Sequence, residues 1–170
     1  ARAYSYIPHK LPIVITRFSN IYGPGQLNFS ALIPDAIRSA LGYSKFIPRG
    51  NGSMMRDFLF IEDVVDLYIR IAESLSKDKG NISGQIFNAG TNNPKTVKQI
   101  LGIIFSATGN INEYNKILKR MENKKTTGEI HSQFMGYVKV EDYFGWTPQH
   151  NVDNGIAKTI EWYKRYLKDR

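Results

Sequence analysis

The chain has 170 residues, 42% of them hydrophobic, so it can bury a core as one domain or as two small lobes. No apolar run approaches the roughly 18 residues of a membrane helix, and the lack of cysteine excludes disulfides and thiolate chemistry. The net charge of +8 comes from dispersed basic residues without zinc ligands or an aromatic–basic motif. We expect a cytoplasmic protein without nucleic-acid or membrane partners, whose charge attracts small anions.

The first predicted strand spans about 12–17, where β-branched residues precede a polar Ser19–Asn20 pair and a Tyr-Gly-Pro turn. Ligands of open α/β sheets bind outside the carboxyl ends of strands, so Asn20 is a candidate ligand contact. Its side chain could equally satisfy backbone groups at the strand end. The strand begins close to residue 1, from which we expect the fold to have an earlier part.

Apolar residues at helical spacing predict a helix over 29–42, followed by a short edge strand at 46–48 and a turn at 50–53. The strand at 46–48 is placed at an edge because Pro48 cannot donate to a central ladder. A buried strand is predicted at 58–61. Glu62 and Asp63 then begin a helix that ends near Ser76, since acidic residues suit the positive end of a helix.

A third strand is predicted at 85–88, after which Thr96 is expected to cap a helix carrying apolar residues as far as Ile104. Residues 109–128 are polar and weakly patterned, and we interpret them as loop-like. Two further helices are predicted, one over 138–144 that ends at a glycine and one over 152–168.

Arg56 is a candidate phosphate-binding residue, because the glycine-rich loop 50–57 delivers it beside a strand. A phosphate favours an arginine fork, neutral amide donors and small residues that permit close approach. Asn88, followed by Gly90, is a second polar strand end. The alternative is that Arg56 only pairs with Asp57 or another surface acid.

Neither a hydrolase triad nor a metal centre is predicted. The three histidines, His9, His131 and His150, lie in polar, loop-like settings without a Gly-x-Ser-x-Gly partner. None is spaced with carboxylates on one helix face, as a metal site of this kind requires.

Five motifs follow one another along the chain: Arg17-x-x-Asn20-x-Tyr22-Gly23-Pro24, Leu32-Ile33-Pro34, Gly50-x-Gly52-x-x-x-Arg56-Asp57-Phe58-x-x-x-Glu62-Asp63, Phe87-Asn88-Ala89-Gly90 and Gly145-Trp146-x-Pro148. Their order and spacing resemble the extended short-chain dehydrogenase/reductases, the NAD-dependent epimerases and dehydratases of nucleotide-sugars. The stretches 25–35 and 129–134 are similar to CDP-glucose 4,6-dehydratases. Gln26 departs from that branch, where an acidic residue is usual, so the nucleotide stays open.

The resemblance implies an α/β fold, the C-terminal part of a Rossmann-type extended short-chain dehydrogenase with a small mixed α/β substrate-binding lobe. Residues 1–170 would include the last Rossmann strands, at about 12–17, 58–61 and 85–88. The N-terminal NAD-binding half would be absent. The family's catalytic Tyr and Lys would then lie upstream of Ala1, so no catalytic and no metal-binding residue is expected here.

Tyr6 and Lys10 literally match the family's Tyr-x-x-x-Lys acid–base pair. The chemistry needs the two side chains one helical turn apart, so that the ammonium lowers the phenol pKa. Pro8 interrupts such a helix, and we interpret the match as a coincidence.

Carried over residue by residue, the resemblance implies substrate-binding side chains. Asn20 and Arg56 match residues that contact the diphosphate of the sugar nucleotide. The other matches are Leu32 and Ile33 beside the phosphates, Ile47 and Pro48 against the base, and Asn88 near the nucleoside. Asp63 resembles a structural acid at a helix start, and Trp146 and Pro148 resemble packing residues of the C-terminal lobe.

The expected function is therefore the nucleotide-sugar-binding half of an NAD-dependent, CDP-glucose-like 4,6-dehydratase, inactive as this chain alone. The resemblance implies NAD as the cofactor, bound mainly by the absent half, a nucleotide-diphosphate sugar as the ligand, and a homodimer at full length. A 4-epimerase or reductase of the same family is the alternative reaction. A non-catalytic sugar-nucleotide-binding module and a basic nucleic-acid binder are the alternatives of other classes.

Overall fold

The computed structural model describes residues 2–5, 11–77, 82–125, 128 and 130–168, so the Tyr6–Lys10 match lies outside the described residues. None of the helices in these ranges is long and apolar enough to cross a membrane. The elements in chain order are a 3₁₀ helix η1 (Arg2–Ser5), β1 (Ile15–Phe18), β2 (Asn20–Tyr22), α1 (Leu32–Ala40), β3 (Met55–Arg56), β4 (Phe58–Phe60), α2 (Ile61–Lys77), β5 (Ile86–Ala89), β6 (Lys95–Thr96), α4 (Val97–Ala107), α5 (Ile111–Met121), β7 (Ser132–Gln133), α6 (Val138–Phe144) and α7 (Val152–Lys168).

The chain changes strand partner at Ser19. β1 pairs in parallel with β5, whereas β2, one residue further on, pairs in parallel with β4. The backbone N–H of Ser19 donates to the Ala89 carbonyl at 3.0 Å, and the next N–H, of Asn20, donates to the Asp57 carbonyl at 3.0 Å. One extended segment therefore contributes to two small parallel sheets.

This change of partner corrects the strand predictions. The strand expected at 12–17 begins only at Ile15, and pairing continues beyond Ser19 as β2. The strand expected at 58–61 belongs with β2 and lies in a different sheet from the strand expected at 85–88. Residues 46–48 form no strand, because the Phe46 N–H donates to the Ser39 hydroxyl at 3.1 Å instead of to a ladder.

A third sheet, in the order β6–β3–β7, holds the loop segment that follows α1. β3 pairs antiparallel with β6 and parallel with β7, so Arg56 lies opposite Lys95 on one side and Gln133 on the other. Two strands distant in sequence thus fix the position of a candidate phosphate-binding residue.

The predicted helices are present where local capping signals are strong. Thr96 begins α4 with a capping box, since its hydroxyl accepts the Gln99 N–H at 3.1 Å and the Gln99 side chain accepts the Thr96 N–H at 2.8 Å. α6 ends at Gly145, which adopts the left-handed conformation with φ of 59°. α1 is shorter than the predicted 29–42, because Phe29 lies before the helix and packs under the Arg38 guanidinium at 4.2 Å.

The loop-like interpretation of 109–128 is wrong, because α5 occupies most of it. The Asn110 side chain caps this helix. Ile117 and Met121 are buried one turn apart, and Tyr114 packs against the same core. The apolar spacing is helical, but the charged residues between these positions conceal it.

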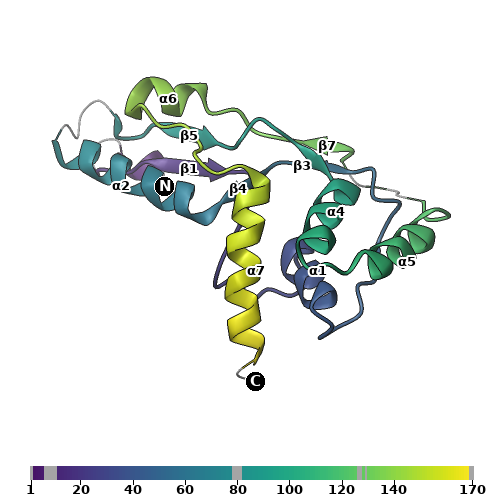
Figure 1. Cartoon of the computed structure of the whole chain (residues 1–170). Coiled ribbons are helices and arrows are strands. Elements are labelled where there is room, and N and C mark those ends of the chain that lie inside the picture. Colours follow the sequence, from purple (N-terminus) through teal and green to yellow (C-terminus); the bar gives the residue numbers. More distant parts are fainter. Residues whose placement is uncertain (1, 6–10, 78–81, 126–127, 129, 169–170) are drawn as a thin grey trace.

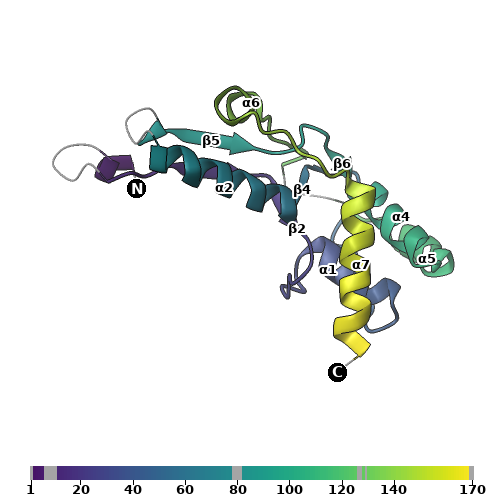
Figure 2. The same cartoon turned by 60° about the vertical axis from the view of Figure 1, so that its left-hand side comes forward.

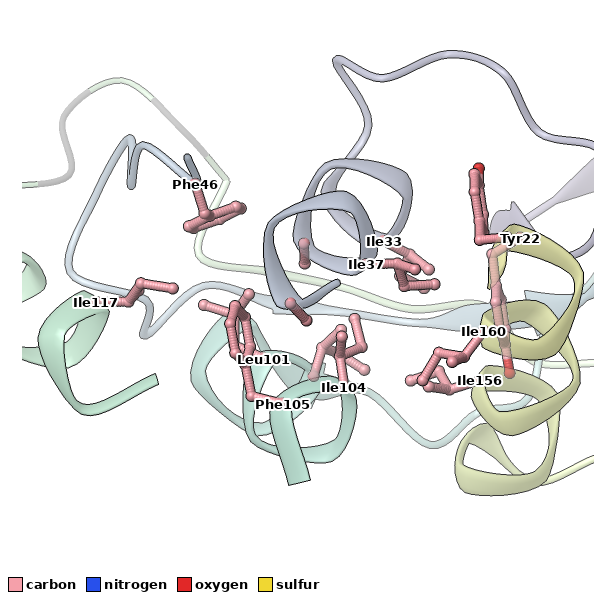
Figure 3. Packing of buried hydrophobic residues seen from close by; sticks show 14 of the residues in the cluster. Tyr22, Ile33, Ile37, Phe46, Leu101, Ile104, Phe105, Ile117, Ile156 and Ile160 are labelled. Carbon is pink, nitrogen blue, oxygen red and sulfur yellow. The ribbon is translucent and has the colours of Figure 1, made fainter. Parts of the chain in front are cut away.

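The described residues form two hydrophobic clusters. Of the helices that contribute to them, α2 and α6 lie beside β1 and β5, and α1, α4, α5 and α7 gather at the other end of the molecule (Figures 1 and 2). The larger gathers side chains from α1, α4, α5 and α7, with Ile33 and Ile37 of α1 facing Ile156 and Ile160 of α7 (Figure 3). The smaller gathers residues of β4, β5, α2 and α6 around Trp146. Trp146 therefore packs with β4, β5, α2 and α6, and not with the larger cluster of α1, α4, α5 and α7.

Asp63, at the start of α2, ties the segment after Trp146 to this helix. Its carboxylate accepts the backbone N–H groups of Gln149 at 3.2 Å and His150 at 3.1 Å, and lies 2.8 Å from His150 Nδ1. Its carbonyl accepts the Trp146 indole N–H at 3.1 Å. The geometry confirms the interpretation of Asp63 as a structural residue.

Asp57, directly after Arg56, is a buried acid whose carboxylate accepts several hydrogen bonds. Its carboxylate is fully buried and accepts the Thr91 N–H at 2.9 Å, the Thr91 hydroxyl and the Met135 N–H at 3.3 Å. Gly90 approaches it so closely that an added Cβ would overlap the carboxylate. One side chain thus joins β4, the end of β5 and the segment after β7.

We predict that Asp57→Ala lowers the free energy of unfolding by about 2–5 kcal/mol, because each buried donor left without an acceptor costs about 1–3 kcal/mol. Chemical denaturation measures the change. Asp66→Ala is the matched control, since Asp66 and Arg70 form a surface pair with side chains 44% and 42% exposed, worth about 1 kcal/mol or less. Equal losses for the two variants would contradict the role assigned to Asp57.

Candidate functional site

A cavity of about 420 Å³ opens between β2, the start of α1, the segment 46–54 and the walls that α4 and α5 provide. Six of the seven residues predicted to bind substrate line it, from four separate segments of the chain. They are Asn20, Leu32, Ile33, Ile47, Pro48 and Arg56.

Asn20 lies at the first position of β2 and is exposed to the cavity. Its side-chain amide donates to the Asp57 carbonyl at 3.2 Å, the same carbonyl that accepts its backbone N–H. The strand-end bond therefore exists, and it holds the amide at the cavity wall beside β3.

Residues at the start of α1 line the cavity. Ala31, the N-cap, provides no side-chain hydrogen bond, and Leu32 and Ile33 follow it along the wall. Ile33 is only 2% exposed and packs in the larger cluster, which anchors this end of the helix. The positive end of a helix with uncapped N–H groups is suited to an anion.

Two arginines add positive charge. Arg56 is half-buried, and its Nη1 donates to the carbonyls of Met55 at 2.8 Å and Ile130 at 2.9 Å, which fixes the guanidinium against β3. Arg49 is exposed and donates to the Ser30 carbonyl at 3.4 Å, next to the start of α1. The cavity thus combines fixed positive charge with an amide and a helix terminus.

The remaining wall is apolar. Phe46 and Pro48 are buried, while Ile47 is 69% exposed at the rim. Met121 of α5 lines the same cavity, and the Lys124 ammonium donates to the Pro48 carbonyl. This wall can pack against the flat face of an aromatic ring such as a nucleobase.

The structure does not bring Asn88 to the cavity. Asn88 lies in β5 opposite Arg17 of β1, and it is exposed while its neighbours Phe87 and Ala89 are buried. Side chains alternate along a strand, so Asn88 points to the opposite face from the core. Asn88 therefore does not line this cavity, and its contact with a nucleoside stays a prediction.

Sequence reasoning missed several residues of the cavity. Asp35 and Arg49 are not among the residues assigned from the family motifs. Each is a charged residue close in sequence to a predicted contact, and this proximity could have identified it. Met54 and Met121 were missed for another reason, since an apolar wall built from distant segments has no local signature.

Two buried tyrosines support the floor of the site. The Tyr163 hydroxyl donates to the carbonyl of Gln26, a cavity residue, and burial raises the Tyr163 pKa to about 12. Burial, together with the nearby Asp63 carboxylate, raises the pKa of Tyr22 further. Both phenols therefore remain protonated at neutral pH and act as structural donors.

We compared the chain with models of protein families and with known proteins. The model of the NAD dependent epimerase/dehydratase family matches residues 2–90, just over half of the chain. The human dTDP-D-glucose 4,6-dehydratase is 32% identical over 158 residues, which cover 92% of this chain and 43% of that protein. The dTDP-glucose 4,6-dehydratase of Escherichia coli is 30% identical over 156 residues, 90% of this chain and 42% of that protein. The chain therefore spans less than half the length of these relatives.

Solved structures show the same likeness. The dTDP-glucose 4,6-dehydratase of Bacillus anthracis in complex with NAD has a TM-score of 0.77 at 27% identity, over 99% of this chain and 49% of that one. The Bordetella bronchiseptica enzyme WbmF in complex with NADH has a TM-score of 0.79 at 27% identity, over 99% and 50%. The likeness confirms the predicted α/β, Rossmann-type fold class.

The described residues do not fit the pyrophosphate of NAD, although NAD is the cofactor of the matching family. A dinucleotide site needs a glycine-rich turn between a strand and a helix, with the helix start facing the phosphates. β4 runs directly into α2 without a glycine, and the connection from β2 to α1 has Gly23 and Gly25 but Asn28 where the dinucleotide turn has its third glycine. Neither junction matches that turn, so no step involving NAD is assigned to the described part of the chain.

We predict that the protein loses stability as the pH rises from about 10 towards 12, and that Tyr163→Phe reduces this loss. The folded-state pKa of Tyr163 is raised from 10.0 to about 12, so over this range the unfolded chain loses the proton first. Thermal unfolding at pH 8, 10 and 11 measures the effect, with the exposed Tyr143→Phe as control. The same alkaline loss in both variants would contradict the prediction.

Proposed function

The chain belongs to the NAD-dependent epimerase/dehydratase family, and on this premise we propose that its cavity binds a nucleotide-diphosphate sugar. The observation that carries the proposal is the meeting of Asn20, Arg56 and the start of α1 around one cavity that also has an apolar wall. A diphosphate needs the first group of features and a nucleobase needs the second.

Within the cavity we assign the diphosphate to Arg56, the Asn20 amide and the backbone of Leu32 and Ile33. The base lies against Ile47 and Pro48. The hydrogen bond from the Lys124 ammonium to the Pro48 carbonyl helps to hold this base-binding segment in place. Asn88 does not line the cavity, so we assign it no contact there.

For the reaction, we propose a 4,6-dehydration of a nucleotide-glucose. Support comes from the relatives of about 30% identity, which are named dTDP-glucose 4,6-dehydratases, and from the similarity of 25–35 and 129–134 to CDP-glucose 4,6-dehydratases. We take CDP-glucose as the first substrate to test. The role of this chain's residues is to bind the substrate and fix the position of its sugar relative to the cofactor-binding half.

We propose that the 170 residues alone bind the nucleotide without turning over the sugar, since the described part of the chain contains neither the three-glycine dinucleotide loop nor the family's Tyr-x-x-x-Lys pair. The active protein would then combine this chain with an NAD-binding half, as a cytoplasmic homodimer. The domain assignment of 1–170 as the substrate-binding half is part of the same proposal.

We predict that Arg56→Ala weakens binding of CDP by about 10–100-fold, because a hydrogen bond to a charged group contributes about 1.5–3 kcal/mol. Titration calorimetry with CDP and with cytidine separates the phosphate contribution from the base, and cytidine binding should not change. Arg17→Ala is the matched control, because Arg17 is exposed in β1 away from the cavity. Equal weakening of CDP and cytidine would argue against a phosphate contact.

We predict no 4-keto product when the 170-residue chain is incubated with NAD and CDP-, UDP-, dTDP- or GDP-glucose. A longer protein that joins this chain to the family's NAD-binding half should release water from one of these sugars, as mass spectrometry of the product shows. Turnover by the chain alone would refute its assignment as a binding half. Inversion without loss of water by the longer protein would indicate an epimerase.

A further inference from the structure

The cavity carries one carboxylate among its described lining residues, that of Asp35. Asp35 lies in the first turn of α1, is half-buried, and donates its backbone N–H to the Ala31 carbonyl at 3.1 Å. An acid in the first turn of a helix is favoured by the helix dipole, which explains its helical position but not its orientation to the cavity.

The surroundings of Asp35 identify which part of a ligand it faces. Arg38 and Arg49 are the charged groups that act on its carboxyl, and both lower its pKa, while burial raises it by a larger amount. The Arg38 guanidinium lies 4.2 Å over the Phe29 ring. Arg49 follows Ile47 and Pro48 directly and donates to the Ser30 carbonyl, just before α1. Asp35 lines the same cavity as these residues, so the start of α1 lies beside the base-binding wall.

A carboxylate in this place disfavours the phosphates of a ligand and requires a donor. Ribose hydroxyls, amino groups of the base and ring N–H groups are the donors that a nucleoside offers. Cytosine presents an amino group at C4 beside the acceptor N3, whereas uracil and thymine present the acceptor O4 beside the donor N3–H. An acid that faces C4, with an arginine that faces N3, matches the cytosine pattern. In uracil and thymine the same carboxylate would face the acceptor O4 and the arginine would face the donor N3–H.

We propose that Asp35 is the residue that selects the base, accepting the C4 amino group of cytosine and so favouring CDP-linked sugars over UDP- and dTDP-linked ones. Arg49 is the neighbouring donor to N3 or O2. The inference rests on the proposed function, since it assumes that the cavity binds a nucleotide. It separates this chain from its relatives, whose names give dTDP-glucose as their substrate.

The test is titration calorimetry of the chain with CDP, UDP, dTDP and GDP. The wild-type chain should bind CDP about tenfold or more tightly than UDP, in line with the discrimination that one well-placed base contact gives. Asp35→Asn should bring the CDP/UDP ratio close to 1, because an amide can donate to O4 as well as accept from an amino group. Asp153→Asn, in the first turn of α7 and away from the cavity, is the matched control and should keep the wild-type ratio.

The outcomes separate the inference from the proposed function. If the wild-type chain binds none of the four nucleotides, the proposed function fails. If it binds UDP or dTDP as tightly as CDP, or GDP most tightly, or if Asp35→Asn keeps the preference, the nucleotide site stands and the base-selecting role is wrong. Equal weakening of CDP and UDP in Asp35→Asn would assign Asp35 to the ribose instead.

A modified ligand tests the same contact without a mutation. CDP with two methyl groups on its C4 amino nitrogen has no N–H donor for Asp35, so we expect the wild-type chain to bind it about tenfold more weakly than CDP. Unchanged affinity would overturn the inference even if Asp35→Asn fails to fold, which its thermal unfolding curve would reveal.

Discussion

The buried carboxylate of Asp57 is the constraint on which the candidate site depends. It holds the turn after β5 through Thr91 and the segment after β7 through Met135, while its carbonyl accepts both the backbone and the side chain of Asn20. A buried carboxylate is stable only when its oxygens are paired, so these segments have one low-energy arrangement. Arg56 precedes Asp57 in the chain, and its position at the cavity wall follows from that arrangement.

Packing within the fold also fixes the start of α1. Ile33 is packed in the larger cluster and also lines the cavity. Pro34 is buried beside it and has no N–H, and no side chain of the N-cap occupies the remaining donors of the first turn. A helix anchored by its core face can keep its N-terminus open to an anion, because the fold and not the ligand positions it.

The sequence predicted those features that depend on neighbouring residues. Thr96 with Gln99 and the glycine after Phe144 are local capping signals, and the helices they bound lie where expected. The change of partner at Ser19 depends on bonds to Ala89 and Asp57, far away in the chain, and no local pattern announces it. For the same reason the motif that contains Asn88 identified a polar strand end without giving the face on which its side chain lies.

Several residues of the family motifs have a structural role and do not contact the ligand cavity. Asp57, Gly90, Asp63 and Trp146 belong to the quoted motifs, yet each is buried in contacts that hold segments together. In this chain such residues hold the cavity in place and do not line it. Residues that discriminate between nucleotides must then lie on the cavity wall outside this framework, where a substitution alters the ligand contact without cost to the fold. The exposed rim residues of the segment 46–49 and the free face of the first turn of α1 meet that condition, which is why base recognition is to be sought there and not in the motifs themselves.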